Sequence, residues 1–171
     1  MPSHSSMKLT TWKATGLNAP SRKRLLKHNI KYFNSNVILI QESKLNSVEI
    51  DKFIKMLGVW CSLFQVSLGA SRGLGMLWDP RKVNIKILNC SKNWISGKVQ
   101  SLKSDLNFTI INVYDLVNNT NKQLVCNEIG QFLDSLENEL FILGGDFNMI
   151  LYINEKIGGS QVLSQASIDF K

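Results

Sequence analysis

Apolar runs and amphipathic stretches alternate in the first third of the chain. The β-branched run Val37-Ile38-Leu39-Ile40 is typical of a buried strand, and residues 7–12 predict an earlier one. Apolar residues recur at helical spacing over residues 22–33, and again from Ser47 to a stop at Gly58. The order strand, helix, strand, helix predicts an α/β arrangement for this part of the chain.

From Trp60 onward the pattern changes to strands joined by turns. Val83, Ile85 and Ile87 alternate with Asn84, Lys86 and Leu88, which favours an extended chain. A Gly-rich stretch over residues 69–73 predicts a hairpin loop, because no Gly-Lys-Ser/Thr follows it. Strands are predicted over residues 60–68, 74–78, 83–90, 94–102 and 107–114, a helix over 122–136 and the first turns of another over 164–170.

The apolar run Leu140-Phe141-Ile142-Leu143 leads into two glycines and then into Asp146, Phe147 and Asn148. Such a run predicts a strand covered on both faces that stops at a polar site. Asp146 and Asn148 would point to the same side if the chain stays extended. A carboxylate beside an amide can activate water next to a phosphate, and the alternative is an Asx turn at a strand end.

Polar groups stand at three predicted strand ends. Glu42 follows the run over residues 37–40, Asn112 and Tyr114 end the strand over 107–114, and Asp146 ends the last apolar run. Loops that leave the strands of an α/β fold at one edge often form the active site. A Glu in this place can ligate a hard cation such as Mg²⁺, or it can be a solvated strand terminus.

Composition agrees with a globular protein that binds a polyanion. The 171 residues fit one domain, and 44% of them are hydrophobic. A net charge of +7 suits nucleic acid. The basic residues of the predicted helix over 22–33 can form a solvated face or a DNA contact.

The three cysteines are far apart in the sequence and have no CxxC spacing, so we expect reduced thiols and neither a zinc site nor a disulfide framework. No apolar run reaches membrane-spanning length, and no signal-peptide pattern is present. We therefore expect a protein that is not secreted, in the nucleus or the cytoplasm. The cysteines are Cys61, Cys90 and Cys126.

Taken together and in order, these motifs resemble the endonuclease/exonuclease/phosphatase family. They are most similar to the endonuclease domains that precede reverse transcriptases in plant non-LTR (LINE-type) retrotransposons. The similar stretches are residues 12–18 with Pro20 and Lys23-Arg24, Gln41-Glu42-Ser43-Lys44, 69–78 with Asp79-Pro80, Asn112-Val113-Tyr114, 144–148, and Glu155-Lys156 with Gly158-Gly159-Ser160.

The resemblance implies an α/β (α+β) fold, a four-layer sandwich of two mixed β-sheets flanked by helices. It implies that Glu42 binds Mg²⁺ or Mn²⁺ and that Asp146 activates the attacking water. Asn148 would help hold the phosphate, Tyr114 would stabilise the pentacovalent phosphorus, and Asn112 would contact the substrate. The implied partners are DNA and a reverse transcriptase module in a longer protein, without a membrane, and we expect a monomer.

Two departures from the family pattern predict impaired activity. The family's first motif is Trp-Asn, but Lys13 follows Trp12 here, and a lysine there can pair with Glu42 in place of a metal. The sequence also lacks the closing Ser-Asp-His motif, so we expect a domain that is incomplete at its C-terminus, without the last strands. We predict an impaired Mg²⁺-dependent DNA endonuclease, with a non-catalytic nucleic-acid-binding remnant or a phosphatase as alternatives.

Overall fold

The computed structural model describes residues 6–66, 73–114, 119–150, 152–155, 157–159, 162–163 and 165–169. These residues form two compact units. The first comprises Met1–Tyr114 and Leu140–Asp146, and the second comprises Asp115–Glu139 and Phe147–Lys171. The single domain expected from the chain length stays a prediction.

The first unit begins with a mixed four-stranded sheet, sheet A. Its strands lie in the order β1-β2-β4-β3. β1 and β2 are parallel and are connected through helix α1, whereas β4 is antiparallel to both of its neighbours. The strands are β1 Leu9–Lys13, β2 Val37–Gln41, β3 Cys61–Gln65 and β4 Leu74–Trp78, and the helices are α1 Pro20–Phe33 and α2 Ser47–Leu57.

A second mixed sheet, sheet B, completes the first unit. Its order is β5-β6-β7-β8, with antiparallel pairs except for the parallel pair of β7 and β8. The pairing of β5 with β6 shifts its register between Ile87 and Asn89, which marks a bulge. The strands are β5 Val83–Cys90, β6 Trp94–Ser101, β7 Asn107–Tyr114 and β8 Phe141–Asp146.

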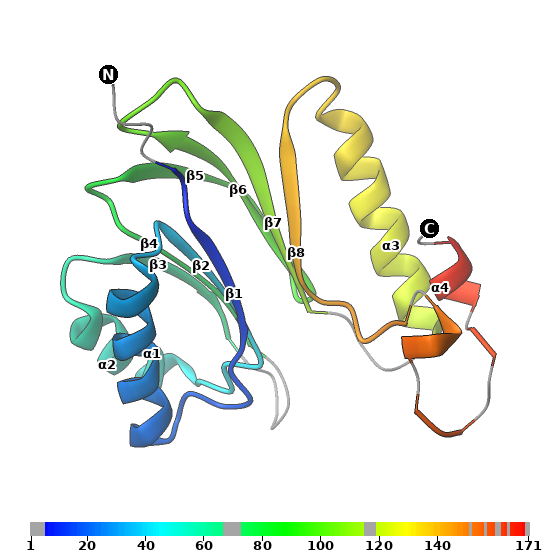
Figure 1. The fold of residues 1–171 in the computed structure, drawn as a ribbon, viewed down its shortest axis with the longest axis horizontal. Coiled ribbons are helices and arrows are strands. Elements are labelled where there is room, and N and C mark those ends of the chain that lie inside the picture. Colours follow the sequence, from blue (N-terminus) through cyan, green and yellow to red (C-terminus); the bar gives the residue numbers. More distant parts are fainter. Residues whose placement is uncertain are drawn as a thin grey trace. The chain divides into compact units, whose positions relative to one another are not determined.

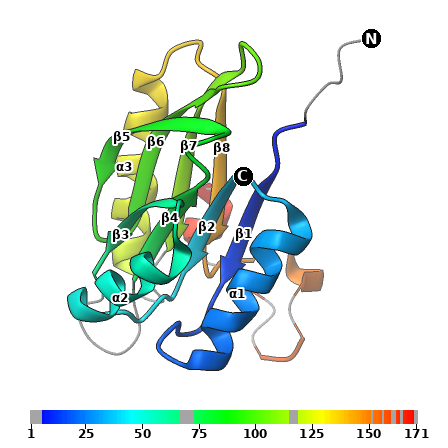
Figure 2. The same ribbon diagram turned by 90° about the vertical axis from the view of Figure 1, so that its left-hand side faces the viewer.

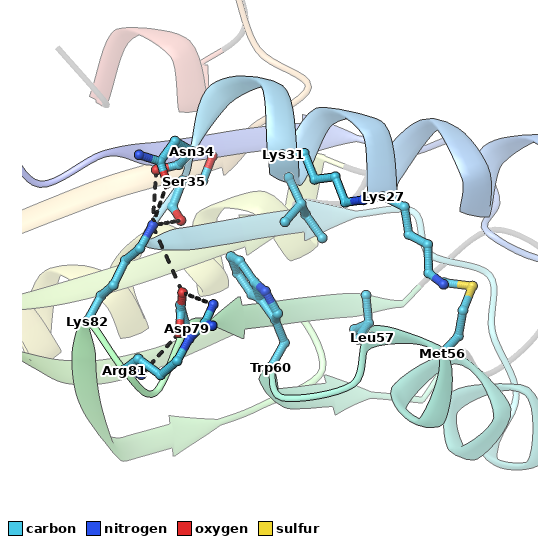
Figure 3. A pocket seen from close by; sticks show the side chains of 11 residues that line it. Lys27, Lys31, Asn34, Ser35, Met56, Leu57, Trp60, Asp79, Arg81 and Lys82 are labelled. Atoms are coloured by element: carbon cyan, nitrogen blue, oxygen red, sulfur yellow. Dashed lines mark hydrogen bonds and ion pairs between the residues drawn. The ribbon is translucent and has the colours of Figure 1, made fainter.

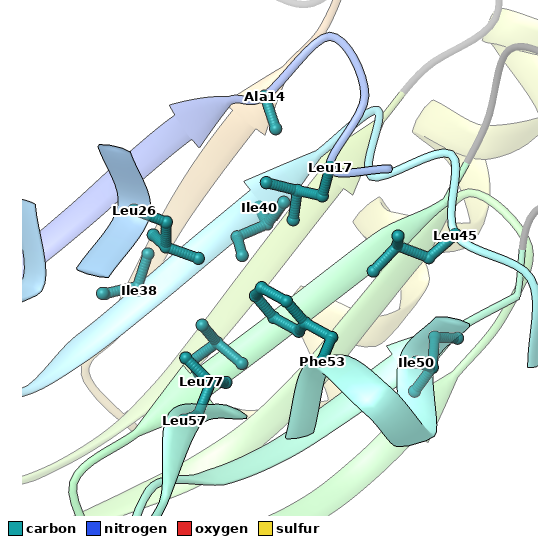
Figure 4. Packing of buried hydrophobic residues seen from close by; sticks show 10 residues of the cluster. All are labelled: Ala14, Leu17, Leu26, Ile38, Ile40, Leu45, Ile50, Phe53, Leu57 and Leu77. Atoms are coloured by element: carbon teal, nitrogen blue, oxygen red, sulfur yellow. The ribbon is translucent and has the colours of Figure 1, made fainter. Parts of the chain in front are cut away.

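Sheet A lies between two hydrophobic cores because alternate residues of a strand point to opposite faces. Val37 and Leu39 pack between the sheets, together with residues of β4, β5, β6 and β7. Ile38 and Ile40 face the other way, into a core shared with residues of α1 and α2. Figures 1 and 2 show both helices on the same side of sheet A. The core on this helix side is shown in Figure 4, where the Phe53 ring of α2 lies among the leucines and isoleucines.

The helix α2 begins with a complete capping box. The Asn46 side chain accepts a hydrogen bond from the backbone N–H of Glu49, and the Glu49 carboxylate accepts one from the backbone N–H of Asn46. Ile50, Phe53 and Leu57 are buried along one face, and Gly58 stands at the end of the helix. Local capping and the apolar stripe therefore agree on where this helix starts and stops.

The second unit contains helix α3 Asn119–Ser135, the 3₁₀ turn η1 Ile153–Glu155 and the short helix α4 Gln165–Asp169. Within this unit α3 contacts α4, and the Lys122 ammonium donates a hydrogen bond of 2.6 Å to the backbone oxygen of Asn148. The helix predicted over residues 122–136 is thus found, with a start three residues earlier.

The predicted α/β class with two mixed sheets and flanking helices is confirmed. The strands over 74–78, 83–90 and 107–114 have the predicted bounds. All three cysteines are free in the structure. The hairpin loop predicted over residues 69–73 lies outside the described residues except for Gly73. No helix in the described part of the chain is long and apolar enough to cross a membrane.

The prediction that β8 is covered on both faces is wrong. Phe141 and Ile142 are 48% and 41% exposed, and the preceding Leu140 is 67% exposed. The reason is position: among the described residues β8 pairs only with β7, so it lies at the edge of sheet B. An apolar run therefore indicated a strand correctly here but not its burial.

Candidate active site

The end of β1 and the end of β2 bring the first two site residues together. The parallel register pairs Lys13 with Gln41, and Glu42 follows Gln41 directly. Beyond the strands, the backbone N–H of Gly16 donates a hydrogen bond of 2.8 Å to the backbone oxygen of Glu42, and the backbone N–H of Leu17 donates one of 2.7 Å to the backbone oxygen of Ser43. These bonds continue the pairing past the strand ends and fix the backbone that carries Glu42.

Glu42 itself has a strained backbone, with a φ of +53°. A side chain other than glycine rarely adopts this left-handed conformation, and such residues concentrate at functional sites. Its carboxylate accepts a hydrogen bond of 2.8 Å from the Tyr114 hydroxyl. The strain and this bond together aim the carboxylate at the end of β7.

The parallel pairing of β7 with β8 delivers the other half of the site. Tyr114 is opposite Asp146 in the register, and Val113 is opposite Gly145. Gly145 has a φ of +140°, and a Cβ there would clash with the Val113 backbone. Only glycine lets the two strands approach closely enough to place Asp146 beside Tyr114.

Lys13 joins the two halves. Its ammonium lies 2.6 Å from Oδ2 of Asp146 and 3.6 Å from Oε1 of Glu42. The side chains of Glu42 and Asp146 are 16% and 18% exposed, so the pair is partly shielded from water. The hydrogen bond to Asp146, with the charges of both carboxylates, raises the pKa of Lys13 above its ordinary value of 10.5. The lysine is therefore charged at neutral pH.

A buried amide pair supports the site from below. Gln41 donates a hydrogen bond of 2.6 Å to Asn112 and one of 3.1 Å to Thr11. Asn112 donates in turn to the backbone oxygens of Ile40 and Gly75, at 3.1 and 2.9 Å. Both amide side chains are 1% exposed or less. This network connects strands of sheet A to β7 of sheet B immediately beneath Glu42.

The structure brings three of the predicted site residues together: Glu42, Tyr114 and Asp146 share one cluster with Lys13. The predicted pairing of Lys13 with Glu42 is confirmed, and the closer contact of Lys13 with Asp146 was missed. No signal in the sequence pattern indicates that contact, because it depends on how β1 approaches β8.

Two further predicted residues lie elsewhere. Asn112 is fully buried and bonded to protein groups, so it positions the site from beneath, and a contact with substrate stays a prediction. Asn148 belongs to the second unit, where its carbonyl accepts from Lys122. The strand ends at Asp146, and Asn148 has a φ of +46°, so the chain does not stay extended between them. Its role towards phosphate stays a prediction.

Glu42 and Asp146 are the potential ligands of a divalent cation in this cluster. Carboxylate oxygens such as those of Glu42 and Asp146 are the ligands that Mg²⁺ prefers. The Lys13 ammonium contacts both of them, and a protonated ammonium cannot coordinate a metal. Within the described ranges, no group of three or more His, Cys, Asp or Glu side chains could hold a metal ion. The residues do not fit a divalent cation while Lys13 keeps this position.

Solved structures with the same arrangement of strands and helices identify the fold, whereas no family model and no curated protein matches the sequence. One is an endonuclease/exonuclease/phosphatase family protein from Bacteroides thetaiotaomicron, with a TM-score of 0.66, 11% identity, and coverage of 83% of this chain and 63% of that one. The chain has the endonuclease/exonuclease/phosphatase fold.

Two other structures with this fold illustrate its range. A D. rerio TDP2 complexed with a single-strand DNA product has a TM-score of 0.64 and 14% identity, over 85% of this chain and 62% of that one. A mannosyl-6-phosphatase from Bacteroides thetaiotaomicron has a TM-score of 0.65 and 13% identity, over 84% and 66%. The chain thus spans less than two thirds of each of these proteins. At such identities the likeness concerns the fold.

Proposed function

We propose that this chain is a retrotransposon-derived, endonuclease-like domain whose site is built for DNA phosphodiester hydrolysis but is impaired. One observation carries the proposal: the Lys13 ammonium contacts both Glu42 and Asp146, the two carboxylates on which the reaction depends. The rest of the site, with the Tyr114 hydroxyl on Glu42, keeps the arrangement expected of a hydrolase.

The chemistry explains why this ion pair matters. Hydrolysis of a phosphodiester needs a base that takes a proton from water and groups that neutralise the charge gained by the phosphate oxygens. Asp146 is suited to be the base, but the Lys13 ammonium, 2.6 Å from Oδ2, occupies an oxygen that would have to accept the proton of the water. Glu42 is suited to hold Mg²⁺ or Mn²⁺, which would supply positive charge at the phosphate. The Lys13 ammonium, 3.6 Å from the Glu42 carboxylate, occupies the place of that cation.

DNA is the substrate class that the charge favours. The chain carries a net charge of +7, and helix α1 contains no acidic residue. The TDP2 structure with the same fold contains a single-strand DNA product, which supports the same class here. On this account the protein works as a monomer in the nucleus or cytoplasm, next to a reverse transcriptase module of a longer protein.

Nicking of supercoiled plasmid tests the proposal. With Mg²⁺ or Mn²⁺ present, we expect the wild-type protein to nick plasmid no faster than Asp146→Ala, with the general base worth about 10²–10⁴-fold in an intact site. Wild-type nicking that Asp146→Ala abolishes would show an intact endonuclease and contradict the impairment. Lys86→Ala, on the exposed side of β5, is the control for preparation and folding.

Two alternatives give different results in the same preparation. A non-catalytic nucleic-acid-binding remnant predicts DNA association that weakens with salt and survives Asp146→Ala unchanged. A phosphatase, favoured by the fold shared with the mannosyl-6-phosphatase, predicts release of inorganic phosphate from a sugar phosphate and no plasmid nicking. Measuring binding, nicking and phosphate release side by side therefore separates the three.

A further inference from the structure

A cavity of about 450 Å³ lies in the first unit, away from the candidate active site. Its walls come from the C-terminal parts of α1 and α2 and from the turn after β4. The two sites lie at opposite ends of β2. Ser35, which lines the cavity, precedes the strand by two residues, and Glu42 follows directly after its last residue. The cavity is within the size range of small-molecule sites and shares no lining residue with the carboxylate cluster.

The lining combines positive charge with an aromatic wall. Lys27, Lys31, Arg81 and Lys82 line the cavity together with a single carboxylate, that of Asp79. Trp60 also lines the cavity, as do the apolar residues Ile30, Met56 and Leu57. Figure 3 labels Trp60, Met56 and Leu57 among the lining side chains. Cations next to a flat aromatic surface suit a ligand that has both a phosphate and a planar ring.

Two of the four cations have structural partners. Arg81 makes a bidentate contact with Asp79, with both N···O distances 2.9 Å. This contact uses two of the five guanidinium donors and leaves the others available. The Lys82 ammonium donates a hydrogen bond of 2.7 Å to the Asn34 side chain and bonds of 3.4 Å to the backbone oxygens of Asn34 and Ser35. These bonds give backbone carbonyl groups at the C-terminal end of α1 a donor. Figure 3 shows both sets of contacts.

The other two cations, Lys27 and Lys31, have no hydrogen-bond or ion-pair partner within the described residues. They continue a row that starts at Lys23, with a spacing of four residues along α1, and the helix has no acidic residue to neutralise them. Like charges at this spacing destabilise a helix. The fold therefore keeps a row of unneutralised lysines along α1 that leads to the cavity. These lysines are not needed at the C-terminal end of α1, because Lys82 already donates hydrogen bonds there.

We propose that this cavity binds a nucleotide, with the phosphate on Lys27, Lys31 and the free donors of Arg81 and with the base against Trp60. The nucleotide can be free or part of a single strand, since both present the same phosphate and ring. A neighbouring hollow of about 280 Å³ shares Asn34 and Lys82 with the cavity and adds Lys8 and Lys103, which could hold the next phosphate of a strand. The proposal is independent of hydrolysis at Asp146.

Titration of the ¹⁵N-labelled protein with deoxyadenosine monophosphate, followed through the indole N–H peaks of its four tryptophans, tests this site. The Trp60 peak is assigned with Trp60→Phe. We expect that peak to shift. Inorganic phosphate and adenosine each carry only one of the two recognised groups, so we expect each to bind at least about tenfold more weakly than deoxyadenosine monophosphate. A Trp60 peak that does not move, or equal binding of inorganic phosphate, would overturn the proposal.

Charge reversal locates the binding. We expect Lys27→Glu with Lys31→Glu to weaken nucleotide binding by about tenfold or more. The matched control is Lys52→Glu with Lys55→Glu, the same change of charge on exposed positions of α2 outside the cavity, which should bind within about twofold of wild type. Equal loss in both double variants would assign the effect to net charge and contradict the site. Circular dichroism confirms that each variant is folded.

A short oligothymidylate distinguishes the two sources. If it displaces the mononucleotide and Lys8→Ser with Lys103→Ser weakens only the oligonucleotide, a strand is the ligand. If it fails to displace the mononucleotide, a free nucleotide is the ligand. Failure of both probes to shift Trp60 would exclude the site, whatever the plasmid assay shows.

Discussion

The ammonium of Lys13 and the carboxylate of Asp146 lie 2.6 Å apart, which joins the end of β1 in sheet A to the end of β8 in sheet B. The same ammonium is 3.6 Å from Glu42. This one lysine therefore contacts both carboxylates to which the proposed function assigns the hydrolysis. If that proposal holds, the contact that links the two sheets also occupies the acidic groups of the site.

Removal of the buried Asn112 amide should destabilise the fold strongly. Asn112→Ala leaves the backbone oxygens of Ile40 and Gly75 without their donor and removes the acceptor of Gln41. We expect the free energy of unfolding to fall by about 3 kcal/mol, measured by urea denaturation. Asn107→Ala on the same strand is the control, because its side chain is exposed, and it should change stability by less than about 0.5 kcal/mol.

The same network gives Asn112 a second observable. If it positions Gln41 and Glu42, its loss should also disturb the Tyr114–Glu42 bond, which a shift of the Tyr114 signals in NMR would report. An Asn112→Ala protein with an unchanged free energy of unfolding and unchanged Tyr114 signals would show that the amide pair neither stabilises the fold nor positions Glu42.

Substitution of two glycines by alanine should have opposite effects. Gly145→Ala places a Cβ against the Val113 backbone at a φ of +140°, and we expect a loss of more than about 1 kcal/mol in the free energy of unfolding. Gly130→Ala, inside α3 with no atom within contact distance of the added Cβ, should stabilise by about 0.5–1 kcal/mol. A thermal melt of each variant is sufficient. An unaffected Gly145→Ala would contradict the close pairing of β7 with β8, and a destabilised Gly130→Ala would contradict the open surroundings of Gly130 in α3.

The Lys13 ion pairs should make stability fall at alkaline pH. The folded-state pKa of Lys13 is raised above 10.5, chiefly by its hydrogen bond to Asp146. The contribution of a group with a raised pKa is fully present below its unfolded value and is lost as the pH rises through the folded value. We expect wild type to lose stability above pH 10.5 relative to Lys13→Arg, since a guanidinium does not titrate there. Parallel curves for the two proteins would argue against the ion pairs.

The sequence was sufficient to predict most elements of the fold. The alternation of Val83 and Ile85 with polar residues predicted β5, and the apolar stripe of Ile50 and Phe53 predicted α2. These patterns are local and follow from the period of each element. The polar residues at the strand ends also indicated that Glu42, Tyr114 and Asp146 lie close together, because loops that leave the strands of an α/β fold at one edge often form the active site. The structure adds that these residues come from both sheets, Glu42 from the end of β2 in sheet A and the other two from β7 and β8 in sheet B.

Features that depend on contacts between distant segments were not predictable. The exposure of Phe141 depends on which neighbours surround β8 at the edge of sheet B, which its own apolar run does not encode. The pairing of Lys13 with Asp146 requires the two sheets to approach at β1 and β8. The basic cavity likewise assembles Lys27, Trp60 and Arg81 from three separate parts of the chain.

The most direct test of the central claim is Mn²⁺ binding to Lys13→Asn, measured by electron paramagnetic resonance. If the Lys13 ammonium occupies the place of a divalent cation, Lys13→Asn should bind Mn²⁺ at least about tenfold more tightly than wild type, and Glu42→Gln added to it should remove the gain. Lys86→Asn, an exposed lysine of β5, should behave as wild type. Mn²⁺ binding by wild type that equals that of Lys13→Asn would contradict the account.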